Sequence, residues 1–545
     1  MNRLFSIVLA LFIFSSSFAQ TSGTPGENLQ RPKLVVGIVV DQMRWDYLYR
    51  YYDRYTATGG FKRLLNQGFS CENTLIPYGP TVTAPGHASI YTGSVPAING
   101  ITGNLWWDNN EQRDVYCTED KTVQTVGSAD EAGLMSPRNL LVTTIGDELR
   151  LATNFQGKVV GLAIKDRGGI LPAGHDPNGA YWYDAKTGNW ITSSYYMTDL
   201  PQWVKDFNAK KLVDKYYDQN WNTLYPANTY QQSTADNKPY ENQGLGPGFP
   251  YDLKRFIGKN YNVISTVPYG NTFTLDMARA AIEGEALGAD AITDLLAVSL
   301  SSTDYIGHGY GPNSMEQEDD FLRLDKDLGD FLNYLDSKIG QGQYTIFLSA
   351  DHGVAHVPGF MKENKLPAGN FEDAKLLEQL NQQLKDKFGQ PDIIITTSNY
   401  QVVLNKKLIN DAKLDKKAII NLTIDFLSKQ PGVARVIEIN ELANAPLNSK
   451  IKEMLINGYY PPRGGDIQII LQSGWIEGFN GTGTTHGVWN PYDAHIPLVW
   501  YGWGIKPGRL NRETNMTDIA PTIAALLRIQ MPSGCVGKVI TEVMK

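Results

Sequence analysis

The feature that most constrains the fold of this chain is a set of short apolar segments, each followed by a charged side chain. Segments that are apolar on both faces are typical of buried strands in a parallel α/β sheet. They cover residues 33–40, 158–164, 292–300 and 344–349, and the charged residues that follow are Asp41, Lys165, Asp304 and Asp351. In open α/β sheets, ligands bind beyond the carboxyl ends of the strands. The sequence therefore predicts one functional site built from distant parts of the chain.

The remaining patterns predict an α/β fold with a central, mostly parallel sheet flanked by helices. Residues 173–270 are rich in Tyr, Trp, Asn, Pro and Gly and show little periodicity, so we interpret them as an irregular insertion that forms a lid or rim. Residues 371–471 alternate between helix and strand patterns and predict a small α+β subdomain. The helix expected at 314–335 is amphipathic, with many acidic residues on its outer face. Other helices are expected at 61–67, 83–93, 272–287, 375–388, 416–428 and 518–527, and other strands at 392–396, 434–439, 466–471 and 496–501.

Length and charge limit the classes of function. With 545 residues and 42% hydrophobic content, the chain can bury a large core. A net charge of −8, without runs of Lys or Arg, argues against polymeric nucleic acid as a partner. A small phosphorylated substrate remains compatible, because local charge at a site can oppose the global sign. We expect a monomer.

The N-terminus has the pattern of a cleavable secretory signal. Arg3 supplies a positive charge, residues 4–14 are apolar, and the Ser-Phe-Ala of residues 17–19 resembles a cleavage site. The apolar stretch is too short to span a bilayer comfortably, and no later stretch is long and charge-free enough. We therefore expect removal of residues 1–19 and export to the periplasm, without stable membrane insertion. Residues 20–545 are expected to form a single catalytic domain.

The cysteine content is compatible with an exported protein. In an oxidising compartment Cys71 and Cys117 could pair. Cys535 would then be left over, as a structural buried thiol.

Thr83 occupies a chemically special position at the predicted start of a helix. It is interpreted as the N-cap, with Pro85 in the first turn and Gly93 as the residue that ends the helix. A hydroxyl there faces free backbone N–H groups and the positive end of the helix dipole, which suits a nucleophile or a bound oxyanion. An alcohol needs a metal or a base to ionise at neutral pH. On local sequence alone, an ordinary Thr N-cap is the simpler interpretation.

Carboxylate and imidazole side chains also occur in close pairs. Asp304 and His308 are four residues apart, Asp351 and His352 are adjacent, and His486 lies in a glycine-flanked turn. Mixed nitrogen and oxygen ligands without thiolate fit a catalytic rather than a structural zinc ion, although the same set accepts other metals such as manganese or cobalt. Each pair alone is explained as well by an ordinary hydrogen bond, whereas the whole set is far more specific.

The ordered motifs of the chain resemble those of the alkaline phosphatase superfamily. The resemblance rests on Asp41, Thr83 in Thr-Ala-Pro-Gly-His, Asp304-x-x-x-His308, Asp351-His352-Gly, Thr-His486-Gly and the closing Met-Thr-Asp-Ile-Ala-Pro-Thr-Ile of residues 516–523. Within that superfamily, Asn104 and Lys165-Asp-Arg167 are similar to the PafA-type bacterial periplasmic alkaline phosphatases, whose nucleophile is Thr. The similarity spans residues 31–544.

This resemblance implies two zinc ions per chain. The implied ligands are Asp304, His308 and His486 for one ion, and Asp41, Asp351, His352 and Thr83 for the other. A small phosphate monoester would transiently phosphorylate Thr83. Lys165, Arg167 and Asn104 are implied to bind the nonbridging oxygens of the phosphate.

Three other functions are compatible with parts of the pattern. A phosphodiesterase or nucleotide pyrophosphatase on the same scaffold would gain less from Lys165 and Arg167, because a diester carries less charge. A sulfatase would need a Cys or Ser nucleophile and a following Arg, which the segment at Thr83 lacks. A noncatalytic exported binding protein would have lost the nucleophile or a ligand, and none is missing. These comparisons favour a secreted phosphomonoesterase.

Overall fold

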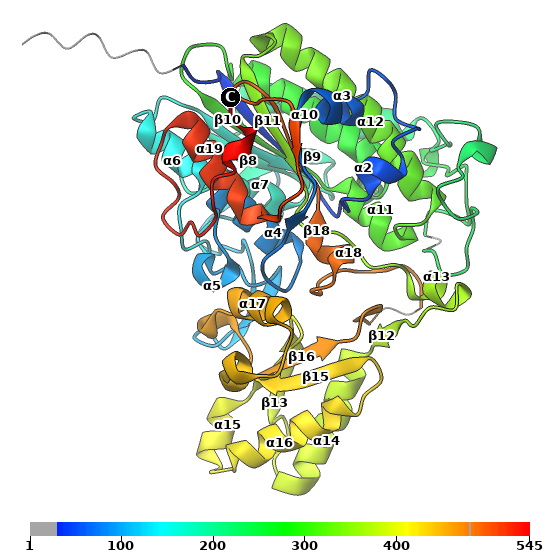
Figure 1. Cartoon of the computed structure of the whole chain (residues 1–545), viewed down its shortest axis with the longest axis vertical. Coiled ribbons are helices and arrows are strands. Elements are labelled where there is room, and N and C mark those ends of the chain that lie inside the picture. Colours follow the sequence, from blue (N-terminus) through cyan, green and yellow to red (C-terminus); the bar gives the residue numbers. More distant parts are fainter. Residues whose placement is uncertain (1–29, 243, 479–480) are drawn as a thin grey trace, which may run out of the picture. The chain divides into compact units, whose positions relative to one another are not determined.

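A ten-stranded sheet forms the centre of the fold (Figure 1). The computed structural model describes residues 30–242, 244–478 and 481–545, and the chain from Pro32 to Lys545 forms one unit. Five neighbouring strands, β11 to β8, run parallel, and the strands that flank them, β19 and β9, are antiparallel to their neighbours. In sheet order the strands are β20 (Gly508–Leu510), β2 (Phe69–Cys71), β19 (Leu498–Gly502), β11 (Tyr344–Ser349), β1 (Leu34–Val40), β10 (Asp294–Leu300), β7 (Val159–Ala163), β8 (Gly179–Asp184), β9 (Asn189–Ser193) and β6 (Thr125–Val126).

Strand β1 lies between β10 and β11, with Leu34 opposite Asp294 and Tyr344. All seven of its residues are buried, and they are mainly Val and Ile. β-Branched side chains pack well on a pleated surface. A strand that is buried on both faces of the sheet needs apolar side chains on both faces, so its sequence is apolar throughout. The predicted α/β class with a mostly parallel sheet is confirmed.

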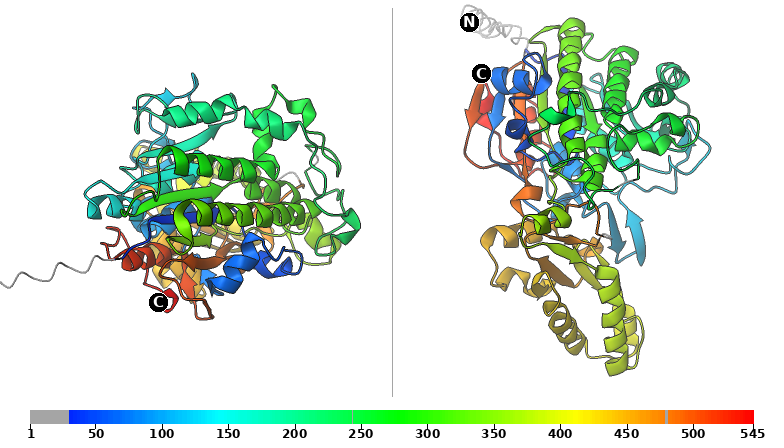
Figure 2. Two further views of the ribbon diagram at one scale, coloured as in Figure 1. Left: turned by 90° about the horizontal axis from the view of Figure 1, so that it is seen from above. Right: turned by 90° about the vertical axis from the view of Figure 1, so that its right-hand side faces the viewer.

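Helices cover both sides of this sheet, as Figure 2 shows. Gly37 and Gly161 allow the helices on one side to approach closely. A Cβ at Gly37 would lie 2.3 Å from the hydroxyl of Tyr91 in α4, and a Cβ at Gly161 would lie 2.2 Å from the carbonyl oxygen of Gly169 in α7. The helices in this layer are α4 (Thr83–Thr92), α5 (Pro96–Asn99), α6 (Ile145–Ala152), α7 (Asp166–Ala173) and α19 (Ile519–Leu527), and those elsewhere around the sheet include α2 (Tyr47–Arg50), α3 (Gly60–Gln67), α10 (Tyr269–Gly284), α11 (Ser302–Tyr310) and α12 (Met315–Leu335).

Residues 173–270 are more regular than predicted. They contribute β8 and β9 to the central sheet, and the helices α8 (Gln202–Ala209) and α9 (Leu212–Tyr217). The prediction of an irregular insertion is therefore wrong for its first half, where strand β8 is rich in aromatic residues and buried along its length. The second half consists mainly of loops and short 3₁₀ turns, as expected.

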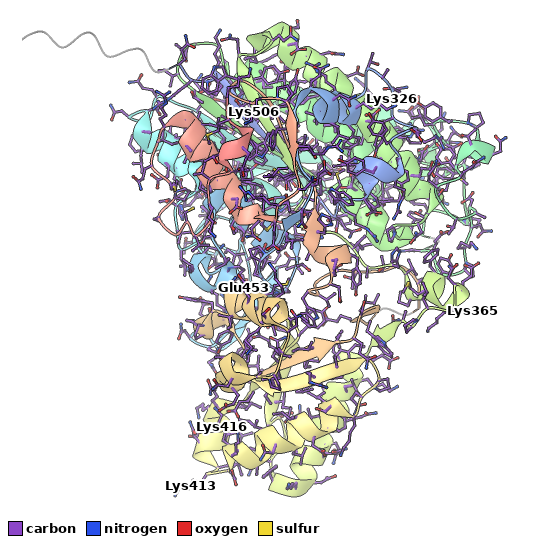
Figure 3. The ribbon with its side chains drawn as sticks, in the orientation of Figure 1. Lys326, Lys365, Lys413, Lys416, Glu453 and Lys506 are labelled. Carbon is purple, nitrogen blue, oxygen red and sulfur yellow. The ribbon has the colours of Figure 1, made fainter. Side chains whose placement is uncertain are left out.

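The acidic residues of α12 are largely buried, which corrects the prediction that they line an outer face. Glu316, Glu318, Asp319, Asp320 and Asp325 each have 0% exposed area. Other segments supply the hydrogen-bond and ion-pair partners of these carboxylates. The pairs are Tyr251 with Glu316, Arg54 with Glu318, Trp221 and Tyr230 with Asp319, Asn271 with Asp320, and Thr56 with Asp325. Lys326 of the same helix is exposed (Figure 3). A charge pattern alone does not reveal that hydroxyl, indole and guanidinium donors cover one side of a helix.

Residues 371–471 contain both helices and an antiparallel sheet. The sheet has the order β13 (Ile394–Ser398), β14 (Gln401–Leu404), β16 (Ile467–Leu471) and β15 (Val433–Glu438). Lys413 and Lys416 are exposed at the outer edge of this segment (Figure 3). Strand β14 and the helices α15 (Lys406–Asp411) and α17 (Ser449–Gly458) were not expected, whereas α14 (Asp373–Phe388) and α16 (Lys416–Ser428) were.

Two further predictions concern the cysteines and the N-terminus. In the described part of the chain, Cys71, Cys117 and Cys535 are free thiols, so the pairing of Cys71 with Cys117 that the sequence left open is not formed. The two buried side chains belong to different hydrophobic clusters, which explains why they do not meet. The predicted signal peptide, residues 1–19, lies outside the described residues. Among the helices that the structure describes, none is long and apolar enough to cross a membrane.

Candidate active site

The strands that precede the predicted charged residues are neighbours in the sheet. Their order is β11, β1, β10 and β7, and because all four run parallel, their carboxyl ends lie at one edge. The side chains that follow them, in the same order, are those of Asp351, Asp41, Asp304 and Lys165. Lys165 Nζ donates hydrogen bonds to Asp41 Oδ2 at 2.7 Å and to Asp304 Oδ2 at 2.6 Å. The topology thus brings together charged groups that are distant in sequence.

Thr83 is the first residue of α4, a helix whose residues are all buried. Val82 is the N-cap, so the predicted N-cap position of Thr83 is wrong by one residue. The hydroxyl lies 3.5 Å from His352 Nε2. Gly86 lets the helix approach the carboxylates, since a Cβ there would lie 2.5 Å from Asp351 Cβ. The helix N-terminus therefore directs an alcohol toward acidic and imidazole groups.

Three histidines direct their Nε2 atoms into the same space. Their Nδ1 atoms bond to backbone carbonyl oxygens, namely Thr484 for His308 at 2.8 Å, Gly353 for His352 at 2.9 Å and Thr81 for His486 at 2.7 Å. A carbonyl oxygen can only accept, so Nδ1 carries the proton and Nε2 of the neutral ring has a free lone pair. A ring nitrogen held by a backbone carbonyl is typical of metal-binding histidines, because it fixes both the tautomer and the ring.

Each of these Nε2 atoms lies close to carboxylate oxygens. Nε2 of His352 lies 3.3 Å from Asp351 Oδ2 and 3.6 Å from Asp41 Oδ1. Within the ranges that the structure describes, Asp41 Oδ1 and Asp351 Oδ2 are buried without a hydrogen-bond partner. Buried acceptors without partners are costly, and a cation placed among them would satisfy all of them together. The local chemistry therefore fits a metal centre.

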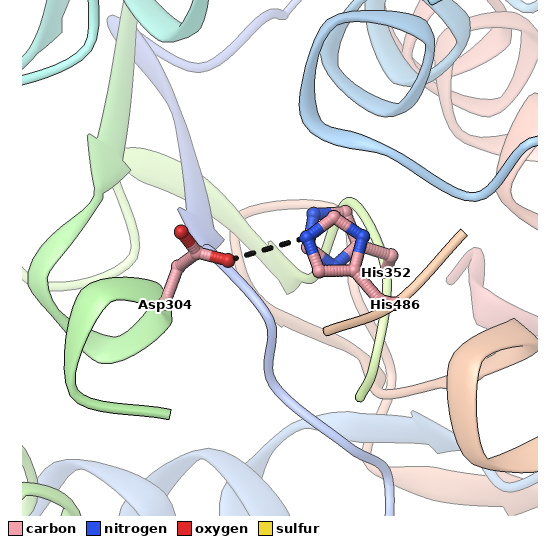
Figure 4. A group of neighbouring side chains, drawn as sticks. All are labelled: Asp304, His352 and His486. Carbon is pink, nitrogen blue, oxygen red and sulfur yellow. Dashed lines mark ion pairs between the residues drawn. The ribbon is translucent and has the colours of Figure 1, made fainter. Parts of the chain in front are cut away.

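Two groups of these side chains could each hold a metal ion. Within each group, one ligand atom from every residue lies within 4.8 Å of the others. The groups are Asp304, His352 and His486, drawn in Figure 4, and Asp41, Asp351 and His352. Carboxylate and imidazole without thiolate is a donor set that zinc accepts. His352 is common to both groups, so the two candidate sites adjoin.

The expected ligands are all present at this place, with one difference in their grouping. His308 was expected beside Asp304 and His486. Its Nε2 is 3.2 Å from Asp304 Oδ1, and its ring centroid is 5.0 Å from that of His486. The tighter group around Asp304 contains His352 instead, whose ring stacks on that of His486 with centroids 3.5 Å apart.

Buried charges determine the electrostatics of the site. Burial raises the pKa of Asp41 to about 6, although Lys165 opposes the shift. Burial and the charge of Asp41 hold the pKa of Asp351 well above its ordinary value. Burial acts in the same direction on Asp304, but His308 and Lys165 outweigh it and hold its pKa well below the usual range. Bound divalent cations would favour the charged form of every carboxylate here.

Two other polar side chains join the site from separate segments. Asn104 Oδ1 accepts a hydrogen bond from the Ala84 N–H at 2.8 Å, which orients the amide and leaves its NH₂ group as a separate donor. Arg167 Nη1 donates to the Tyr116 hydroxyl at 3.0 Å, and this hydroxyl donates to Asp166 Oδ1 at 2.7 Å. Tyr116 thus holds the guanidinium group in place, a role that the sequence analysis missed.

Gln42 is a second supporting residue that the sequence analysis missed. Its Nε2 donates to Asp304 Oδ1 at 2.7 Å, and its backbone N–H donates to Asp351 Oδ1 at 3.1 Å. The residue has a φ of 66°, which is uncommon for a residue other than Gly. A Cβ at Gly307 would lie 1.8 Å from Gln42 Oε1. Gly307 lies between Asp304 and His308 in the sequence. A glycine at this position of a helix indicates that another side chain approaches α11 closely.

Replacing Gln42 by Leu should weaken metal binding by ~10- to 100-fold, because Asp304 would lose the donor that orients it. Titration of the metal-free protein with zinc in the presence of a competing chelator would measure this change. Gln112→Leu is a matched control, since Gln112 also has a positive φ but is exposed on the surface. Equal zinc affinity in the Gln42 variant and the control would contradict the role assigned to Gln42.

The fold and the site define the class of this protein. Residues 35–493 match the family model described as type I phosphodiesterase / nucleotide pyrophosphatase. The chain belongs to this family, within the alkaline phosphatase superfamily.

Individual relatives match over most or all of the chain. Alkaline phosphatase PhoV of Synechococcus elongatus is 54% identical over 552 residues, covering 100% of both chains. A protein of Myroides odoratus named calcium-transporting ATPase is also 54% identical over 552 residues, with the same coverage. The crystal structure of wild-type alkaline phosphatase PafA is 52% identical with a TM-score of 0.93, covering 95% of this chain and 100% of that chain. The predicted α/β fold with a mostly parallel central sheet is therefore shared with PafA.

Proposed function

We propose that this protein is an alkaline phosphatase that hydrolyses phosphate monoesters with two zinc ions per chain and Thr83 as the nucleophile. The observation that carries the proposal is the pair of carboxylate–imidazole groups that share His352, with the Thr83 hydroxyl 3.5 Å from that ring. The proposed ligands are Asp41, Thr83, Asp304, His308, Asp351, His352 and His486. The names of PhoV and PafA support the phosphomonoesterase activity.

The reaction proposed for this site is a double displacement. When bound, zinc lowers the pKa of a coordinated hydroxyl and neutralises the charge of a departing alkoxide. Thr83 Oγ1 gives up its hydroxyl proton and attacks phosphorus, the bond from phosphorus to the alcohol oxygen breaks, and phosphothreonine forms while the departing alkoxide takes up a proton. Water then attacks the phosphothreonine, which releases inorganic phosphate and returns a proton to Thr83. The N-terminus of α4 favours negative charge at this position.

Lys165 and Arg167 explain a preference for monoesters over diesters. Lys165 Nζ bridges Asp41 of one ligand group and Asp304 of the other, so its charge lies where the two groups meet. Arg167 offers a planar fork, which suits two oxygens of one phosphate. Asn104 would add an amide donor. A dianionic monoester gains more from two cations than a monoanionic diester does.

A phosphodiesterase is the second candidate, and the description of the matching family model favours it. A diester has one fewer negative oxygen and a second organic group, and it would undergo the same displacement at a two-metal site. ATP is a further test substrate, because one relative is named an ATPase and the terminal phosphoryl group of ATP resembles that of a monoester.

The test of the proposed function is a comparison of 4-nitrophenyl phosphate with its methyl diester, and with ATP, on protein reconstituted with zinc. We expect activity to disappear on chelation and to return fully at two zinc ions per chain. The ratio of kcat/KM should favour the monoester strongly. A preference for the diester would assign the protein to the phosphodiesterase branch, and activity on no substrate would favour a noncatalytic binding protein.

Export to the periplasm and a monomeric state are part of the proposal. Export rests on the charged, apolar and small-residue pattern of residues 1–19. The mass of the protein isolated from the periplasm should correspond to a chain that begins at Gln20, and the mass in solution should be that of one chain.

A further inference from the structure

A cavity of about 230 Å³ lies beside the helix α11, which also carries Asp304 and His308 of the candidate active site. The helix α11 lines it through Tyr305, Gly309 and Tyr310, and the second half of the insertion lines it through Leu245, Phe256 and Val263. Neither the proposed metal ligands nor the phosphate-binding residues line this cavity.

The helix α11 places this cavity next to the reacting groups. Asp304 and His308 lie one turn apart and face the metal site. Tyr305 and Gly309 are the residues that directly follow them, so they lie on the neighbouring face of the same helix. The Tyr305 ring has its centroid 5.1 Å from Lys165 Nζ. One aromatic side chain therefore contacts a proposed phosphate-binding cation and also lines the cavity.

The lining indicates what the cavity would bind. Leu245, Phe256, Val263 and the rings of Tyr305 and Tyr310 offer apolar and aromatic surface, while Asn260 and Thr266 add polar groups. Flat rings pack well against aromatic side chains, and a few polar groups fix the orientation of a bound ligand. An apolar cavity of ~150 Å³ holds one benzene ring, so a cavity of about 230 Å³ has room for a ring system.

We propose that this cavity is a subsite for the organic group of the substrate, and that it selects phosphate monoesters whose alcohol carries a flat aromatic ring, such as aryl or nucleoside phosphates. This inference rests on the proposed phosphatase function. The phosphoryl group would lie at Thr83 and Lys165, and the ring would extend past Tyr305. The second half of the insertion would then determine substrate selectivity without touching the reacting atoms.

Three substitutions test the cavity: one fills it, one enlarges it and one leaves it unchanged. Gly309→Leu fills it, because a Cβ at Gly309 would lie 3.8 Å from Asn242 Cβ, an ordinary van der Waals distance, and Leu is a good helix former. Phe256→Ala removes a wall. Ile257→Ala is the matched control, since this neighbouring side chain is exposed and does not line the cavity.

The experiment measures kcat/KM for 1-naphthyl phosphate, adenosine 5′-monophosphate and ethyl phosphate on the zinc-loaded full chain. Gly309→Leu should lower the values for both ring substrates by ~10- to 100-fold relative to ethyl phosphate. Phe256→Ala should produce a smaller loss of the same kind, and Ile257→Ala none. Inhibition by inorganic phosphate should stay unchanged in all three variants. Equal changes for all substrates, or none, would overturn the subsite.

Calorimetry with adenosine alone separates this inference from the proposed function. Adenosine should bind the wild-type protein and bind Gly309→Leu at least ~10-fold more weakly. If the protein hydrolyses no phosphate ester, the proposed function fails, and this binding result still decides the subsite. Equal adenosine affinity in the two proteins, or none in either, would refute it.

Discussion

Thr83→Ala should lower kcat/KM for 4-nitrophenyl phosphate by ~10³-fold or more, because no other side chain can replace the attacking oxygen. Thr83 is the first residue of α4 and caps no backbone group within the described part of the chain. Its loss should therefore leave the folded structure intact. Steady-state kinetics on zinc-loaded protein would measure the loss. Acid quenching with labelled substrate should trap phosphate on the wild-type chain and not on the variant.

Thr83→Ser is the matched control for this prediction, because Ser keeps the hydroxyl and loses only a methyl group. It should retain most of the activity and the trapped phosphate. Zinc content and thermal unfolding of all three proteins would establish that the metal sites and the fold are preserved. Near-normal turnover by Thr83→Ala would exclude Thr83 as the nucleophile and favour direct attack by water.

Replacing Lys165 and Arg167 together by Ala should lower kcat/KM for the monoester by ~10³- to 10⁴-fold, since removing one donor to a developing charge typically costs ~10²- to 10³-fold. The methyl diester should lose much less, because its single charge gains less from either cation. The ratio of the two kcat/KM values, measured on the same protein preparation, reports this difference directly.

Lys165 also contacts Asp41 and Asp304, so the double variant requires a control for metal binding. Zinc content measured by mass spectrometry must equal that of the wild type. Tyr116→Phe provides a milder comparison, because it keeps both cations and removes only the hydroxyl that holds Arg167. Equal loss on the monoester and the diester in the double variant would show that the two cations serve the fold or the metals instead.

The parts of the fold that the sequence predicts best are the buried parallel strands. An apolar segment such as Leu34–Val40 can be recognised as a buried strand from its sequence alone, because burial on both faces requires apolar residues throughout. The charged residues behind such strands were therefore identifiable from sequence. The proposed metal-binding roles of Asp304 and Asp351 were suggested by that pattern together with the paired histidines, and the role of Asp41 was implied by the resemblance to the alkaline phosphatase superfamily.

Residues that act through long-range contacts were beyond the sequence pattern. Gln42 and Tyr116 follow no periodicity, and their roles depend on Asp304 and Arg167, which lie elsewhere in the chain. The acidic side of α12 had the appearance of a solvated face until the partners supplied by other segments were known. Strand β8 was missed because its aromatic residues suggested irregular structure when considered apart from the neighbouring strand β7.

The expected reacting groups came from the resemblance of the motifs to the alkaline phosphatase superfamily. The sequence by itself determined the α/β class and the strands that end in charged residues. These features depend on local patterns of polarity, which every short segment carries independently. Only the tertiary structure decided that His352 adjoins both ligand groups, that Lys165 bridges them and that a cavity opens beside Tyr305. Distances between side chains from different strands depend on sheet order and helix packing, and no local pattern specifies either of them.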